Sequence, residues 1–386
     1  PWIHLQRPRG GGARAGCDGR PPTGQPFLVR DQRRACARPG ANYVGIHDYG
    51  SFYFCHDQFH CGYHLLFYRS SHPLKRGKRI IMKIYQKFYD TDVGYSFFNS
   101  KVAIFSFVLF LIIAFSSLFA EFVSPYNPFD PLNVLLMDAF IPPVWSEGGD
   151  SRFILGTDQQ GRDMLSTIIY GSRISLIVGF ASIIFAMVFG VFLGVTAGYF
   201  GGKYETIVMR LTDVQLTIPS ILMALLVDGI ARAIISKSMH DEMAIYVLIF
   251  AIGISEWPQF ARVTRASTLV EKNKEYVAAS KIIGLSSIYI MFKHILPNIL
   301  RPVLVIATIG LALAIIAEST LSFLGVGVPP TTPSLGTLIR FGNNFLFSGE
   351  WWITFFPAIF LIVLALSINL LGDWMRDALN PKLKKR

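Results

Sequence analysis

Cysteine and histidine, the side chains that most often bind zinc, are concentrated near one end of the sequence. All four cysteines and six of the eight histidines lie within residues 1–81, and five of these side chains stand close together: Cys55, His56, His60, Cys61 and His64. Structural zinc sites usually take their ligands from two half-sites with regular short spacings. This cluster matches no such spacing and has no second half. The sequence therefore predicts no metal site and no bound cofactor.

A glycine-lysine pair at a turn, Gly202-Lys203, is a place to look for nucleotide binding. A P-loop reads G-x-x-x-x-G-K-[ST], so that backbone amides and the lysine surround the phosphates. Here Ala197 stands where the first glycine is required, and Tyr204 stands where Ser or Thr is required. We therefore expect a chain that does not hydrolyse ATP and is not an enzyme.

Three charged residues lie inside strongly apolar segments: Arg210, Asp213 and Glu318. Ionisable side chains are costly in hydrocarbon, so they normally face the interior of a helix bundle or water. Arg210 and Asp213 are three residues apart and are expected to pair on one helix face. Direct contact with a transported solute is the alternative.

The elements that position these charges are membrane helices. Of 386 residues, 52% are hydrophobic and 16% charged, and the mean hydropathy is +0.43, which is typical of a membrane protein. The sequence predicts an all-α polytopic protein with six transmembrane helices, at about 102–120, 174–199, 206–230, 242–257, 299–323 and 352–371. Gly190 and Gly194 form a G-x-x-x-G step that either permits close helix packing or is ordinary glycine tolerance.

Charge indicates the orientation of these helices. Residues 1–81 hold 13 Lys/Arg and 4 Asp/Glu, a net +9 of the chain's +11, so the basic pI gives little support to a nucleic-acid partner. In the remainder, basic residues gather at 262–301 and at 382–386, whereas the loop that starts at residue 121 is acidic. The positive-inside rule then places both termini in the cytoplasm.

Residues 273–298 lie between two apolar segments but are built like a short helix–turn–helix. Asn273 is expected to cap the first helix and Gly284 to end it with positive φ. Ser286 is expected to cap a second helix that Pro297 stops. One face of the first helix should carry residues with i, i+3, i+4 and i+7 spacing: Glu275, Ala278, Ala279 and Ile282.

This pattern resembles the cytoplasmic "EAA" loop of binding-protein-dependent ABC importer permeases. The resemblance rests on Glu275, the pair Ala278-Ala279, Gly284 and the later Ile295-Leu296-Pro297, although Tyr276 stands where the motif's name has alanine. Three further blocks resemble the dipeptide and oligopeptide branch: GTDQQGRD at 156–163, 317–336, and 370–381. An acidic loop before residue 156 is similar to that of its C-type subunit.

The resemblance implies a type I ABC importer permease fold that forms half of a translocation pathway for peptides or similar solutes. It implies an ATPase-coupling role for Glu275, Ala278, Ala279, Gly284, Leu296 and Pro297. The implied partners are a second permease subunit, two ATPase subunits, an extracytoplasmic solute-binding protein and the lipid of a bacterial inner membrane. Nickel or another small solute is an alternative cargo, and a stand-alone secondary transporter or channel is an alternative function.

The expected domain boundaries follow from these elements. Residues 1–81 are expected to be a disordered or wrongly assigned leader, and 82–101 a cytoplasmic N-terminal segment. The first helix, 102–120, and an extracytoplasmic loop, 121–173, precede a permease core of five helices at 174–373. The core contains a cytoplasmic coupling loop at 258–298, and residues 374–386 form a cytoplasmic tail.

Overall fold

The computed structural model describes residues 46–47, 51–52, 92–130, 134–236, 239–329 and 331–379. The chain divides into two units, Pro1–Lys78 and Arg79–Arg386. In the first unit, β1 (Ile46–His47) and β2 (Ser51–Phe52) form a short antiparallel hairpin. The cluster Cys55, His56, His60, Cys61 and His64 lies outside the described residues, as does most of the expected leader.

The described part of the second unit is helical, as expected. Five of its helices are long and apolar enough to span a membrane, or six if one bent pair counts as a single span. This confirms an all-helical polytopic membrane protein. The α-helices are α3 (Asp92–Asn99), α4 (Lys101–Leu118), α5 (Ala120–Val123), α6 (Met164–Phe200), α7 (Gly202–Thr217), α8 (Ser220–Ile234), α9 (His240–Lys272), α10 (Glu275–Ile282), α11 (Ser287–Tyr289), α12 (Leu296–Phe323), α13 (Leu335–Asn343) and α14 (Trp352–Leu379).

The expected third span, 206–230, is a bent pair in the structure. Helices α7 and α8 meet at an angle of 97° across a two-residue break. Ile218 there is extended, with φ −91° and ψ 126°. The cause is Pro219, because a proline ring excludes the preceding residue from the α conformation and provides no N–H for the helix ladder.

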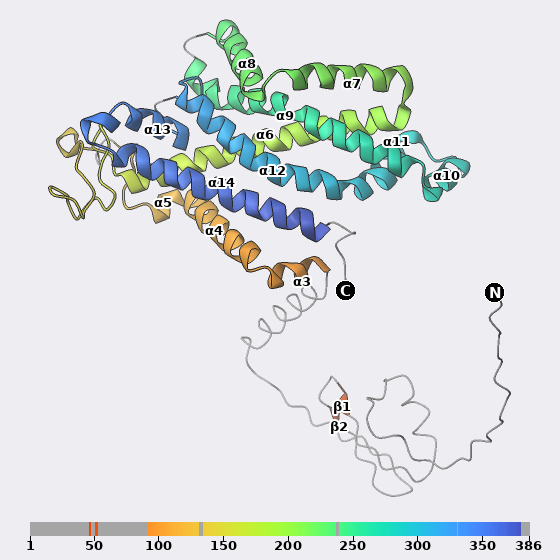
Figure 1. Ribbon diagram of the computed structural model, residues 1–386, viewed down its shortest axis with the longest axis horizontal. Helices are drawn as coiled ribbons and strands as arrows, with labels where there is room; N and C mark the ends of the chain where they lie inside the picture. Colours follow the sequence, from red (N-terminus) through yellow and green to blue (C-terminus); the bar gives the residue numbers. More distant parts are fainter. Residues whose placement is uncertain are drawn as a thin grey trace, which may run out of the picture. The chain divides into compact units, whose positions relative to one another are not determined.

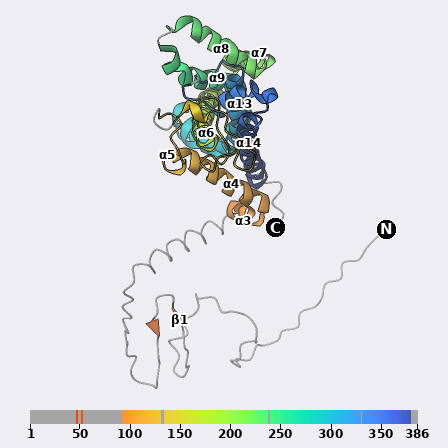
Figure 2. The same cartoon turned by 90° about the vertical axis from the view of Figure 1, so that its left-hand side faces the viewer.

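Helix α6 runs through the middle of the bundle, with α7 and α8 on one side and α4 on the other (Figures 1 and 2). It packs closely on α9 through glycines at four-residue spacing. A Cβ atom on Gly190 would lie 2.5 Å from the Trp257 carbonyl oxygen, and one on Gly194 would lie 2.6 Å from that of Ala261. The G-x-x-x-G step is therefore a close-packing motif, and Gly198 extends it by another turn.

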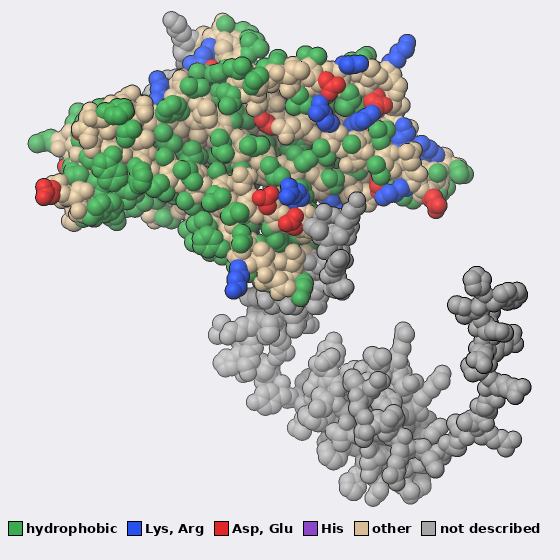
Figure 3. All heavy atoms as spheres, in the orientation of Figure 1, with side chains coloured by type: hydrophobic (Ala, Val, Ile, Leu, Met, Phe, Trp, Pro, Cys, Tyr) green, Lys and Arg blue, Asp and Glu red, His purple; other side chains and the backbone are tan. Residues whose placement is uncertain are grey.

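The two ends of the bundle differ in structure and charge. One end carries the turn between α6 and α7 and the short helix α10 (Glu275–Ile282), and the other carries α13 and the segment before α6 (Figure 1). In Figure 3, Lys and Arg side chains gather near α10 and α7, whereas hydrophobic side chains dominate the middle of this face.

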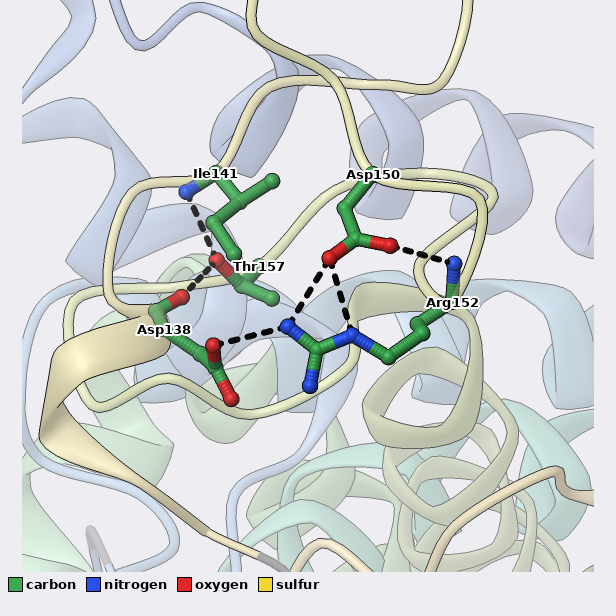
Figure 4. Close-up of polar contacts among 5 residues, drawn as sticks. All are labelled: Asp138, Ile141, Asp150, Arg152 and Thr157. Atoms are coloured by element: carbon green, nitrogen blue, oxygen red, sulfur yellow. Dashed lines mark hydrogen bonds and ion pairs between the residues drawn. The ribbon is translucent and has the colours of Figure 1, made fainter.

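The segment before α6 is held together by its own side chains. Arg152 donates to Asp150 (2.8 Å) and to Asp138 (3.0 Å), and the Thr157 hydroxyl donates to the Asp138 carbonyl (2.6 Å) and accepts from the Ile141 N–H (2.8 Å) (Figure 4). A 3₁₀ turn, η1, spans Leu136–Asp138. Helix α6 then begins at Met164, so this connection is shorter than the expected 121–173 loop.

Asp158 and Arg162 form a buried ion pair in the same segment, with an oxygen–nitrogen distance of 2.6 Å. The Asp158 carboxylate also accepts from the backbone N–H groups of Gln160 and Arg162. Trp352, the first residue of α14, donates its indole N–H to the Thr157 carbonyl at 3.1 Å. These contacts fix the segment to the start of the last helix.

Candidate functional site

Residues 273–298 form the helix–turn–helix that the sequence predicts. Helix α10 (Glu275–Ile282) is followed by α11 (Ser287–Tyr289) and by a π-helical turn, η3 (Ile290–Ile295), which runs directly into α12. The expected loop at 258–298 is shorter in the structure, because residues 258–272 continue helix α9. We therefore call residues 273–298 the coupling loop. It lies at the end of the bundle, beyond the turn between α6 and α7 (Figure 1).

The turn at Gly284 has the geometry expected from its sequence. Gly284 has φ +84°, its N–H bonds the Lys281 carbonyl at 3.0 Å, and the N–H of Leu285 bonds the Ser280 carbonyl at 3.2 Å. This pair of bonds is the Schellman motif, in which positive φ favours glycine. Ser286 caps α11 by accepting from the Tyr289 N–H at 3.3 Å, as predicted.

Two expected capping details are wrong. The N-cap of α10 is Lys274, which makes no side-chain capping bond, whereas Asn273 ends α9 and its side-chain amide donates to the Leu269 carbonyl at 3.0 Å. Pro297 does not stop the second helix but lies in the first turn of α12. Proline is tolerated in the first turn of a helix, where the backbone N–H groups have no partner within that helix.

One face of the coupling loop is anchored in a small apolar cluster. Val277 is fully buried, and Ile290, Met291, Ile295 and Ile299 join it against Val195 and Tyr199 of α6. The loop is therefore attached to the end of α6, the helix that packs most closely on α9.

Tyr276 ties the two halves of the loop together, a role that sequence reasoning missed. Its hydroxyl donates to Glu271 of α9 at 3.0 Å and accepts from the Asn298 side-chain amide at 3.1 Å. Burial raises the pKa of Tyr276, which favours the protonated hydroxyl that donates to Glu271. The sequence did contain a signal for this role, because a tyrosine stands at position 276 where the motif's name has alanine.

The opposite face of the loop is uncovered. The expected set Glu275, Ala278, Ala279 and Ile282 is exposed and lies on the side of α10 away from the cluster. Ile282 is 87% exposed, Ile283 76% and Ile288 67%. We call Ile282, Ile283, Leu285, Ile288 and Phe292 the apolar tip. Leu296 is half-buried at its base and Pro297 is exposed. A concentrated apolar surface on an otherwise charged end is typical of a protein-binding site.

Glu318 occupies a different position, fully buried within α12. Its carboxylate accepts from the hydroxyls of Ser175 on α6 (2.7 Å), Ser322 (2.7 Å) and Ser319 (3.3 Å). Three hydroxyl donors satisfy a group that would otherwise be costly to bury. Ser175 also accepts from the Leu335 N–H at 3.4 Å, so the network joins α6, α12 and the start of α13.

The expected pairing of Arg210 with Asp213 is wrong. Asp213 accepts from Arg262 of α9 at 2.8 Å, and both side chains are more than half exposed, at 54% and 56%. Arg210 is exposed on α7. The partner of Asp213 is 49 residues away in sequence, beyond the reach of spacing rules for one helix.

Comparison with known proteins defines the class of the chain. Residues 190–385 match the family described as binding-protein-dependent transport system inner membrane component, and residues 91–143 match the N-terminal TM domain of oligopeptide transport permease C. The chain belongs to this family of inner membrane transport components. It is 38% identical over 294 residues to the dipeptide transport system permease protein DppC of Haemophilus influenzae, covering 76% of this chain and 95% of that one.

A second relative carries the same name. The dipeptide transport system permease protein DppC of Escherichia coli K12 is 39% identical over 289 residues, covering 75% of this chain and 92% of that one. A solved structure, the MetNI methionine ABC transporter in inward-facing conformations, is 20% identical with a TM-score of 0.44, covering 56% of this chain and 98% of that chain.

Family membership confirms the central expectation from the sequence. The chain is a multi-pass, non-catalytic permease subunit of a bacterial inner membrane ABC importer, and ATP is hydrolysed by a separate protein. Membership also implies an ATPase and a binding protein as partners in general.

Proposed function

We propose that the chain imports peptides, as one of two permease subunits that together enclose a translocation pathway. The support is the naming of its relatives as dipeptide or di/tripeptide transport permeases, together with coverage of 91–95% of their length. The proposed complex contains a second permease subunit, two ATPase subunits and one extracytoplasmic binding protein.

We propose that the coupling loop is where the ATPase acts. The observation that carries this proposal is the division of the loop into an anchored face and an uncovered one. Val277 and its neighbours attach the loop to α6, whereas the apolar tip is exposed at the loop's outer side. A rigid element of this kind transmits movement from a docked protein into the membrane helices. Glu275, Ala278, Ala279 and Gly284 shape the docking face, with Leu296 and Pro297 at its base.

We infer that both termini and the coupling loop are cytoplasmic, with the bent pair α7–α8 counted as the third of six spans. The coupling loop, residues 273–298, holds 3 Lys/Arg and 1 Asp/Glu, whereas residues 121–163 hold 2 Lys/Arg and 7 Asp/Glu. This asymmetry supports a cytoplasmic coupling loop and an extracytoplasmic 121–163 segment under the positive-inside rule. The membrane core then comprises α6 to α14, with α4 as an additional span before it.

The test is co-purification with the ATPase subunits, from cells that produce the complete transporter. We expect Ile282→Asp combined with Ile288→Asp to insert normally but to lose the ATPase, because burying two carboxylates at an apolar interface is costly. The matched control is Met137→Asp at the other end of the bundle, where Met137 is 96% exposed. Retention of the ATPase by the double variant would refute the docking assignment. Uptake of labelled dialanine by the parental transporter tests the peptide assignment separately.

A further inference from the structure

The Arg262–Asp213 pair marks a membrane face that lipid is poorly suited to cover. Arg262 lies in the candidate span 242–272, and Asp213 lies in the bent pair α7–α8, which counts as a further span. Their side chains are joined at 2.8 Å yet remain more than half exposed. Charges exposed to hydrocarbon are expensive, so such groups normally border water or a polar solute.

Packing on α6 fixes the direction of this face. Trp257, Ala261, Thr264 and Thr268 form the stripe of α9 that receives the glycines of α6. At 100° per residue, Gln259 and Arg262 fall on the opposite side of α9. The polar face is therefore held away from α6 by the tightest helix contact in the described bundle, and it cannot turn inward without opening that contact.

A cavity adjoins the pair on this face. It has a volume of about 280 Å³ and is lined by Leu216 of α7, by Gln259, Arg262 and Val263 of α9, and by Ile306 and Ile309 of α12. Its walls are apolar except for one guanidinium and one amide. Ligand sites commonly measure roughly 300–1,000 Å³, so this cavity suits one end of a solute. A carboxylate next to a small apolar body would match both the charge and the walls.

We propose that this cavity binds the terminal carboxylate of the peptide during translocation, with Arg262 contacting that carboxylate and Asp213 positioning Arg262. The proposal rests on the proposed peptide function. A guanidinium has five N–H donors, so its contact with Asp213 is compatible with donation to a second carboxylate. Asp213 also competes with the peptide carboxylate for the guanidinium of Arg262 and so lowers the affinity for the peptide. A lower affinity suits a site that a solute must leave as well as enter.

The first test measures the charge preference of the cavity without transport. In a variant whose four cysteines at 17, 36, 55 and 61 are serine, Val263→Cys places a thiol beside Arg262. We expect an anionic methanethiosulfonate reagent to modify this thiol faster than a cationic one. Adding Arg262→Gln should reduce the ratio of the anionic to the cationic modification rate about tenfold. The control Arg301→Gln, which replaces another exposed arginine, should not change this ratio. Leu304→Cys, on α12 outside the cavity lining, should react slowly with both reagents.

The second test measures transport by the complete transporter. We expect Arg262→Gln to lower dialanine uptake about tenfold while the subunits still co-purify, with Arg301→Gln near the parental rate. Arg262→Lys should retain more uptake than Arg262→Gln, because it keeps the charge but not the planar fork.

Each outcome separates the two proposals. An unchanged rate ratio in Arg262→Gln, or parental dialanine uptake by that variant, would overturn the carboxylate site and leave the peptide function intact. Failure of the parental transporter to import dialanine or any other peptide would instead overturn the proposed function, and the peptide occupant with it.

Discussion

The 121–163 segment and the coupling loop lie at opposite ends of the bundle, and they differ in whether their side chains have partners within the chain. In 121–163, five charged side chains pair with one another: Asp158 with Arg162 in the interior, and Arg152 with Asp138 and Asp150 at the surface. In the coupling loop, side chains that would normally be buried are exposed, above all Ile282 at 87%.

This difference separates a segment that supports its own fold from one that needs a partner. The ion pairs of 121–163 bind that segment to itself, and the hydrogen bond from Trp352 to the Thr157 carbonyl attaches it to α14. The coupling loop has internal order from its Schellman turn, but its apolar tip has no cover among the described residues. Substitutions in 121–163 should therefore act on stability, whereas substitutions in the coupling loop should act on assembly and transport. The predictions below test that division, beginning with the largest effect.

Arg162→Ala should destabilise the protein by about 3–5 kcal/mol, because it leaves the buried Asp158 carboxylate without its cation. Thermal unfolding of the purified protein measures this loss. The matched control is Arg152→Ala in the same segment, whose side chain is 51% exposed and whose ion pairs should contribute little to stability because water screens them. Similar losses for both variants would show that burial does not distinguish the two pairs.

Gly284→Val should abolish transport while leaving membrane insertion intact. A Cβ at Gly284 meets no atom within 4 Å, so the cost arises from positive φ alone, about 1–2 kcal/mol. That strain should redirect α10 relative to α11 and move the apolar tip. The ATPase should then bind poorly, or hydrolyse ATP without transport.

Two variants serve as controls for Gly284→Val. Gly229→Val adds the same side chain in open space within α8, at a residue without positive φ, and should keep most transport. Gly284→Asn should also retain transport, because asparagine tolerates positive φ better than valine does. Parental transport by Gly284→Val would show that the coupling assignment is wrong.

Tyr276→Phe should loosen the loop by about 1 kcal/mol, the usual contribution of a hydrogen bond, and should lower transport only in part. Because burial raises the pKa of Tyr276, the folded state retains the phenol proton more strongly than the unfolded state. Its contribution is therefore fully present below the unfolded pKa, about 10, and is lost as pH rises through the folded pKa. Hydrogen exchange of α10 between pH 8 and 11 should show this loss in the parental protein, and Tyr276→Phe should show less of it.

Local chemistry explains which features the sequence could predict. The positive φ of Gly284, the cap at Ser286 and the apolar spans each depend on neighbours within about one helical turn. The family resemblance of the coupling loop depended on the same short spacings. The role of Gly190 and Gly194 could be predicted only in part. Their G-x-x-x-G spacing permits close helix packing, but it does not identify α9 as the helix that packs there.

Contacts between distant segments explain what was missed. Asp213 pairs with Arg262 rather than with Arg210 because the approach of α7 to α9 decides the partner. The hydroxyl of Tyr276 finds Glu271 and Asn298 only after the loop has folded back on α9. Pro219 was visible in the sequence, but its ability to bend the third span by 97° depends on the helices around it.

Glu275→Ala should have the smallest effect and distinguishes the docking face from the fold that supports it. Glu275 is exposed in the first turn of α10, where a carboxylate stabilises the helix by about 0.3–1 kcal/mol, so thermal unfolding should change little. Binding of the ATPase should weaken a few-fold, since the same carboxylate lies on the exposed face of α10 proposed for docking. The loss should shrink at high salt because an exposed charge is screened. Glu147→Ala removes an exposed carboxylate from 121–163 and should leave ATPase binding unchanged. Equal binding losses in the two variants would mean that overall charge, rather than the face containing Glu275, governs docking.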